Sequence, residues 1–100
     1  MPKKPETLIS NHVLPRLRAE GGWWVKVHGG LFQEAGIPDI IGCWNGKFVA
    51  IELKTPQGEP SELQKYTLNK LDSVGAIVGI ATSVSEALGI RDEKIKFQRF

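Results

Sequence analysis

An Asn45–Gly46 dipeptide lies between two short runs, residues 39–44 and 47–54, that are rich in β-branched and aromatic side chains. Asn-Gly between two such runs is the strongest short-range signal for a β-hairpin, because both residues accept the positive φ angles of a two-residue turn. If these residues form the turn, Trp44 pairs with Lys47, and the register of every other pair follows. One dipeptide therefore predicts both a hairpin and its register.

On either side of this hairpin the apolar pattern changes from helical to extended and back, which predicts the element order α-β-β-β-α-β-α. We expect helices over residues 5–20, 61–74 and 83–88, and strands over residues 23–28, 39–44, 47–54 and 76–81. Pro15 lacks an N–H donor, so we expect it to kink or split the first helix. The expected fold is an α/β domain with a mixed sheet flanked by helices.

Length and composition are those of one ordinary globular domain, residues 1–100. The chain is 41% hydrophobic and 24% charged, which excludes collagen-like and intrinsically disordered chains. Cys43 is the only cysteine, so an internal disulfide and a cysteine-rich zinc site are both excluded. The formal net charge of +2 is too small to indicate a nucleic-acid partner by itself.

We see no signal for a membrane or for export in this sequence. The longest run without a charged residue or histidine, residues 73–85, is shorter than the ~20 apolar residues that a membrane span needs. Residues 1–6 include basic side chains, but neither an apolar run nor a small-residue cleavage site follows them. We therefore expect a cytoplasmic protein that does not enter a membrane.

The hairpin register brings two acidic side chains together. Counting back from the turn places Asp39 opposite Glu52, with Cβ atoms about 5 Å apart on one side of the sheet. Lys54 is two residues from Glu52 and so lies on the same side. Like charges at this distance destabilise a sheet, and either a shared proton or a divalent cation would compensate them. Since Mg²⁺ prefers carboxylate ligands, we favour a metal site over the alternative of a solvated polar strand face.

Pro38 supports this interpretation, because a proline cannot donate to a sheet and so belongs at the start of the strand, with Asp39 at its mouth. The run Gly36-Ile37-Pro38-Asp39, followed by Glu52-Leu53-Lys54 and Gln64, resembles the motif of PD-(D/E)XK nucleases. More closely, it resembles the VRR-NUC (virus-type replication-repair nuclease) domain. The resemblance covers the chain from the first predicted helix to the strand at residues 76–81, and it implies a restriction-endonuclease-like core.

The resemblance also implies roles for individual residues. Asp39 and Glu52 would be metal ligands, the main-chain carbonyl of Leu53 would join them, and Lys54 would position or polarise the attacking water. The implied cofactor is Mg²⁺ or Mn²⁺, and no nucleotide cofactor is expected. A divalent ion suits phosphodiester hydrolysis because it neutralises developing charge and lowers the pKa of a bound water.

Gln64 has two interpretations. It lies three residues after Ser61, so it can close a capping box at the start of the second helix. It also lies at helical spacing from Leu68 and Leu71, which places its amide on the face toward the sheet, where it needs a partner. The resemblance favours the second role, support of the active site.

Further polar side chains are candidates for the edge of this site. Similar nucleases carry an acidic residue in the first helix that supports the metal, which suggests Glu6, with Glu20 as the weaker candidate. The alternative for Glu6 is a favourable charge in the first turn of a helix. Within residues 23–28, side-chain alternation places Lys26 and His28 on the same face as Trp24, and we predict this face to be polar. From it, Lys26 and His28 could contact the phosphates of a nucleic acid.

The function implied is that of a structure-selective DNA endonuclease of the stand-alone phage or bacterial type, acting in replication and repair. Two active sites in a homodimer would suit a two-fold symmetric Holliday junction, and three tryptophans with Phe97 and Phe100 offer apolar area for a dimer contact. The alternatives are a nuclease directed to flaps or nicks, and a nucleic-acid-binding module without catalysis.

Overall fold

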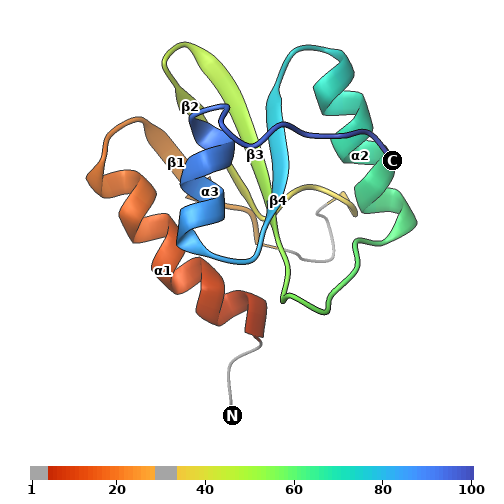
Figure 1. Ribbon diagram of the computed structural model, residues 1–100, viewed down its shortest axis with the longest axis horizontal. Coiled ribbons are helices and arrows are strands. Elements are labelled where there is room, and N and C mark those ends of the chain that lie inside the picture. The colour runs from red at the N-terminus through yellow and green to blue at the C-terminus, as the bar shows by residue number, and fades with distance from the viewer. Residues whose placement is uncertain (1–4, 29–33) are drawn as a thin grey trace.

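The computed structural model describes the backbone of residues 5–28 and 34–100, with side chains from Leu8 onward in the first segment. The elements follow one another as α1 (Pro5–Ala19), β1 (Trp23–Lys26), β2 (Ile40–Trp44), β3 (Lys47–Leu53), α2 (Glu62–Ser73), β4 (Ile77–Ala81) and α3 (Val84–Arg91). The predicted α-β-β-β-α-β-α order and the α/β class are confirmed (Figure 1). Across the described residues, no helix combines the length and the apolar character that crossing a membrane requires.

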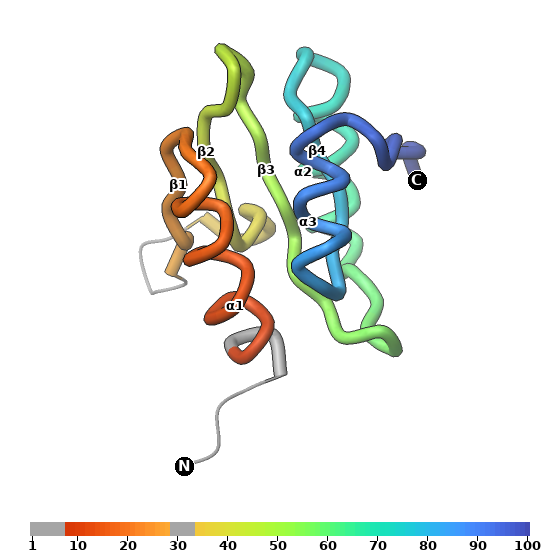
Figure 2. The backbone as a smooth tube through the Cα atoms, turned by 60° about the vertical axis from the view of Figure 1, so that its left-hand side comes forward, coloured from red at the N-terminus to blue at the C-terminus, as the bar shows by residue number. Residues whose placement is uncertain are grey.

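The four strands form one sheet in the order β1-β2-β3-β4. β1, β2 and β3 pair antiparallel, whereas β4 runs parallel to β3 after the crossover through α2. Trp44 pairs with Lys47, and Ile40 with Ile51, so the predicted hairpin register is confirmed. The turn residues Asn45–Gly46 both have positive φ, as this turn requires. Figure 2 shows β2 and β3 side by side, joined by this turn at one end of the sheet.

Helices cover both faces of the sheet. α1 and α3 lie together on one face, where they bury Ile51 and Leu53 of β3 (Figure 1). α2 covers the other face, where Leu68 packs with Ala50. Since side chains alternate along a strand, Glu52 points to the α2 face and is buried there together with its neighbours. An acidic residue thus lies in a strand that is covered from both sides.

The faces of β1 differ from the prediction. The strand ends at Lys26, and Trp24, assigned to a polar face, is 2% exposed and packs in the core. Trp23, on the opposite face of the strand, is 61% exposed. Trp24 is buried because α1 packs against its face of the sheet and contributes Val13 to the same core. The indole of Trp24 also fills the space above Gly42, where a Cβ would lie 2.3 Å from the ring.

The first helix is not split at Pro15, which was one of the two effects expected of this proline. α1 continues from Pro5 to Ala19, and the proline lies on its exposed side. Val13 and Leu17, two residues to either side, are completely buried. The buried residues before and after the proline stabilise a continuous helix, because their packing in the core does not require the hydrogen bond that Pro15 cannot donate.

A buried arginine links α1 to α3, and the sequence analysis did not identify it. Arg91 is largely buried and donates a bidentate pair of hydrogen bonds to Asp92. Its remaining nitrogen donates to Glu20 just after α1, and its guanidinium lies 4.3 Å from the centre of a Trp44 ring. Its charge is thus fully compensated, as a buried cation requires. Glu20, the weaker candidate for metal support, is therefore part of this contact.

Candidate functional site

Asp39 and Glu52 lie at the end of the hairpin opposite its turn. Asp39 precedes β2 by one residue, so it falls opposite Glu52 when the observed pairing of Ile40 with Ile51 is extended by one step. Its carboxylate accepts a hydrogen bond from the N–H of Leu53 at 2.8 Å. Its own carbonyl accepts from the N–H of Val27 at 2.7 Å. Two main-chain contacts from neighbouring strands therefore hold Asp39 in place.

The loop that leads to Asp39 packs tightly against α2. Gly36 has a φ of +85°, and a Cβ at this position would lie 2.7 Å from Cγ of Leu63 and 3.1 Å from Oγ1 of Thr67. Pro38, between this contact and Asp39, is buried. The close approach explains why glycine begins the Gly-Ile-Pro-Asp run, a role that the sequence analysis did not assign to it.

Glu52 is the most deeply buried acidic group among the described residues, with 2% of its surface exposed. Its Oε2 accepts a 2.7 Å hydrogen bond from Nε2 of Gln64 and lies 3.5 Å from Nζ of Lys54. Its Oε1 is buried and has no hydrogen-bond partner. Burial raises the pKa of Glu52 to about 7, the charge of Asp39 adds to the rise, and the Lys54 ammonium opposes it.

Gln64 makes both of the contacts that the sequence left open. Its N–H donates to Oγ of Ser61 at 3.2 Å, and its Oε1 accepts from the N–H of Ser61 at 2.8 Å, so the capping box is present. Its Nε2 faces inward and donates to Glu52. A single amide side chain therefore caps α2 and contacts the buried carboxylate.

Lys54 follows β3 and remains tied to the sheet. Its N–H donates to the carbonyl of Ala81 at 3.1 Å, and its side chain lies on the same face as Glu52, as the alternation predicted. The side chain is 16% exposed, and its ammonium group lies 3.5 Å from Oε2 of Glu52. This position supplies a fixed positive charge at the edge of the site.

The chemistry of these donors fits a hard divalent cation. Asp39 and Glu52 offer carboxylate oxygens, and Oε1 of Glu52 is buried without a partner, which is a costly state that a cation would relieve. The described residues contain no group of three or more His, Cys, Asp or Glu side chains placed to share an ion. Two carboxylates therefore leave the remaining ligand positions to carbonyl oxygens, water and substrate, which suits Mg²⁺ better than a closed structural site.

Three other candidates lie apart from this cluster or outside the described side chains. Nζ of Lys26 donates to Oγ of Ser10 in α1, so it points to the opposite face of the sheet from Glu52. His28 follows β1 and is exposed. Glu6 belongs to α1, but its side chain lies outside the described residues.

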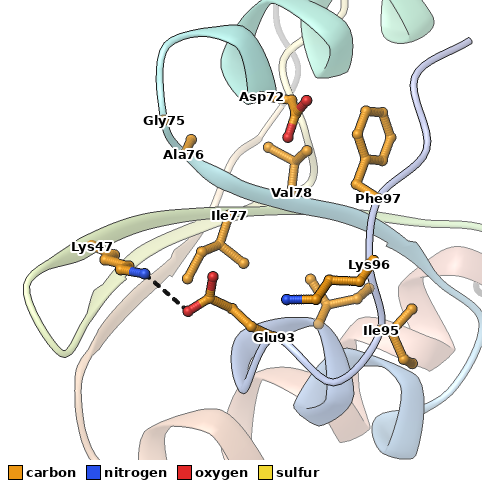
Figure 3. A pocket seen from close by; sticks show the side chains of 11 residues that line it. Lys47, Asp72, Gly75, Ala76, Ile77, Val78, Glu93, Ile95, Lys96 and Phe97 are labelled. Carbon is orange, nitrogen blue, oxygen red and sulfur yellow. Dashed lines mark hydrogen bonds and ion pairs between the residues drawn. The ribbon is translucent and has the colours of Figure 1, made fainter.

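A small pocket lies at the other end of the sheet and is separate from this cluster. It has a volume of about 160 Å³ and lies between the hairpin, the start of β4 and the C-terminal segment (Figure 3). Lys47 and Glu93 form a 3.0 Å ion pair at its rim. Asp72, also in its lining, pairs with Arg99 outside the pocket. The buried, unpartnered side-chain oxygen among the described residues is Oε1 of Glu52, not an atom of this pocket.

Comparison with known proteins supports the fold. No family model matches this sequence, and a search of curated protein sequences gives no match. A solved structure described as a VRR_NUC domain superposes with a TM-score of 0.75 at 19% sequence identity, covering 93% of this chain and 100% of its own. This chain therefore has the fold of the VRR-NUC domain.

Proposed function

We propose that this protein is a metal-dependent endonuclease that hydrolyses phosphodiester bonds in DNA. The observation that carries the proposal is the buried, unpartnered Oε1 of Glu52 beside Asp39, with Lys54 on the same face. The structural neighbour is described as a VRR_NUC domain, and that name, with the matching motif, supports a nuclease. A bound Mg²⁺ or Mn²⁺ would neutralise charge on the phosphate and lower the pKa of a water molecule.

The side chains of this cluster have distinct tasks in the proposed reaction. Asp39 and Glu52 would hold the ion, and the carbonyl of Leu53 would complete the protein ligands. Lys54, whose ammonium lies 3.5 Å from Oε2 of Glu52, would position or polarise the attacking water and stabilise negative charge as that charge develops. Gln64 keeps the carboxylate of Glu52 in one orientation through its hydrogen bond to Oε2.

For the substrate, we propose branched DNA, with the Holliday junction first and flaps or nicks as the alternatives. A junction has two strands to cut in a two-fold arrangement, which matches two copies of one small domain. This reaction belongs in the cytoplasm of a bacterium or of a phage-infected cell. DNA binding by Lys26 receives no support from its contact with Ser10, whereas the exposed His28 remains open to a phosphate.

The test is cleavage of labelled DNA by the full chain and by two matched variants. The substrates are a four-way junction, a flap, a nicked duplex, a single strand and a linear duplex of the same sequence, each with Mg²⁺, Mn²⁺ or EDTA. We expect metal-dependent cleavage that Asp39→Asn abolishes and Asp72→Asn preserves, since Asp72 pairs with Arg99 near the surface. The ranking of substrates separates a junction-resolving enzyme from one directed to flaps or nicks.

The second candidate is a nucleic-acid-binding module without catalysis. It predicts binding of the same DNAs in EDTA and no cleavage by a folded protein with either metal. In such a module a proton on Glu52, hydrogen-bonded to Asp39, would compensate the carboxylate pair in place of a metal ion.

A further inference from the structure

A continuous chain of hydrogen bonds connects the start of α2 to the candidate metal site. The N–H of Ser61 donates to Oε1 of Gln64 at 2.8 Å, and Nε2 of the same amide donates to Oε2 of Glu52 at 2.7 Å. The other carboxylate oxygen, Oε1 of Glu52, is buried and unpartnered. A helix cap and a buried metal ligand are thus two ends of one network.

The direction of this network is set by the main chain. An N–H can only donate, so the amide atom that faces Ser61 is the oxygen of Gln64. The NH₂ group must then face Glu52, and it occupies Oε2. The opposite orientation would place NH₂ against N–H at one end and oxygen against a carboxylate at the other, and both contacts are repulsive.

We propose that Ser61 is a positioning residue of the candidate metal site: its main-chain N–H turns the Gln64 amide so that Oε2 of Glu52 is occupied and Oε1 stays free for a divalent metal ion. This inference rests on the proposed metal-dependent function. It adds that the first turn of α2 and the metal site form one unit. Outer contacts of this kind change metal affinity by about 10 to 100-fold when they are removed from ligand networks.

The backbone at Ser61 allows a selective test. Its φ of −68° and ψ of 165° are angles that proline adopts without strain. Ser61→Ala removes the hydroxyl and keeps the N–H, whereas Ser61→Pro removes both. The difference between the two variants therefore isolates the N–H that holds Gln64.

Calorimetric titration of the full chain with Mn²⁺, without DNA, measures the effect. We expect Ser61→Pro to bind Mn²⁺ about 10-fold more weakly than Ser61→Ala. In a Gln64→Ala background the two substitutions should give equal affinities, because the connection to Glu52 is then absent. Ser83→Ala is the matched control, since it removes the N-cap of α3 and should leave Mn²⁺ affinity unchanged.

The outcomes separate this inference from the proposed function. If the unmodified chain binds Mn²⁺, Asp39→Asn does not, and the Ser61→Pro and Ser61→Ala chains have equal affinities, the role of Ser61 is overturned and the metal site stands. If the unmodified chain binds no Mn²⁺, the proposed metal site is overturned, and the inference fails with it.

Hydrogen exchange of the Ser61 amide gives a second measurement that needs no proline variant. We expect Mg²⁺ to slow this exchange at least several-fold in the unmodified chain and to leave it unchanged in Gln64→Ala, because coupling between two sites is reciprocal. If Ser61→Pro does not fold, this comparison of exchange rates tests the role of Ser61 by itself. An exchange rate that does not respond to Mg²⁺ in the metal-binding chain overturns the proposal.

Discussion

Glu52 has an environment that few acidic side chains tolerate. It is buried between a sheet and a helix, with Gln64 and Lys54 on one oxygen and no partner on the other. Its pKa is raised to about 7 by burial first and by Asp39 second. Residues with such a perturbation cluster at functional sites, which is why this position dominates the proposal.

One prediction at the residue scale concerns stability against pH in the metal-free protein. Because the pKa of Glu52 is higher in the folded chain than in the unfolded chain, the folded state binds the proton more tightly. The stabilisation is complete below about pH 4.5 and is lost as pH rises through about 7. We expect unfolding in urea with EDTA to show that Glu52→Gln gains on the order of 2 kcal/mol relative to the unmodified chain between pH 5 and pH 8. A difference that does not change with pH would contradict this prediction.

A second residue-scale prediction separates Lys54 from the carboxylates. Lys54→Ala should reduce cleavage by at least about 100-fold while Mn²⁺ binding largely persists, because in the proposed reaction the ammonium would stabilise developing negative charge and would not be a metal ligand. Asp39→Ala should lose both. Lys47→Ala is the control lysine, since it pairs with Glu93 at the opposite end of the sheet. Full cleavage by Lys54→Ala would show that Lys54 has no role in the reaction.

At the scale of elements, the candidate site depends on how the loop before β2 meets α2. The element order was predictable, because the Asn45–Gly46 turn and the apolar periods are local signals. The approach of Gly36 to Leu63 was not predictable, since it joins segments that are distant in the sequence. Which face of β1 is buried was also not predictable, because the packing of α1 against the sheet determines it.

Two glycines with similar backbones test this contact. Gly36 and Gly75 both have positive φ, but a Cβ at Gly75 meets no atom within 4 Å, whereas one at Gly36 meets Leu63 at 2.7 Å. Gly75→Ala should lower stability by about 1 kcal/mol through backbone strain alone and leave cleavage unchanged. Gly36→Ala should cost more and also reduce cleavage, because it displaces the loop that carries Asp39. Thermal melts and the junction assay on both variants check this, and equal effects would contradict it.

At the scale of the whole molecule, the described residues leave one uncharged row of the sheet exposed. Trp23, Cys43 and Phe48 pair across β1, β2 and β3 as a row without charge, with Trp23 61% and Phe48 44% exposed. Phe97 and Phe100, which the sequence also suggests for a dimer contact, pack edge to face against each other, and Phe100 is 55% exposed. We expect a second copy to dock here about a two-fold axis, because each copy presents the same uncharged row.

Sedimentation at micromolar concentration tests this expectation. The unmodified chain should sediment as a dimer, and Trp23→Glu should shift it to the 11.1 kDa monomer by placing a charge in the apolar contact. Tyr66→Glu is the control, as Tyr66 is an exposed aromatic residue of α2. Oxidation should link two copies through Cys43, the only cysteine. A monomeric unmodified chain would contradict the dimer.

The sequence by itself determined the hairpin, its register, the element order and therefore the opposition of Asp39 to Glu52, because turn chemistry and side-chain alternation act over a few residues. Only the tertiary structure decided which strand faces are covered, how deeply Glu52 is buried and where the Gln64 amide points. These properties depend on α1 and α2 packing against strands far away in the chain. This packing turns two acidic residues into a candidate site in which one carboxylate oxygen is buried without a hydrogen-bond partner.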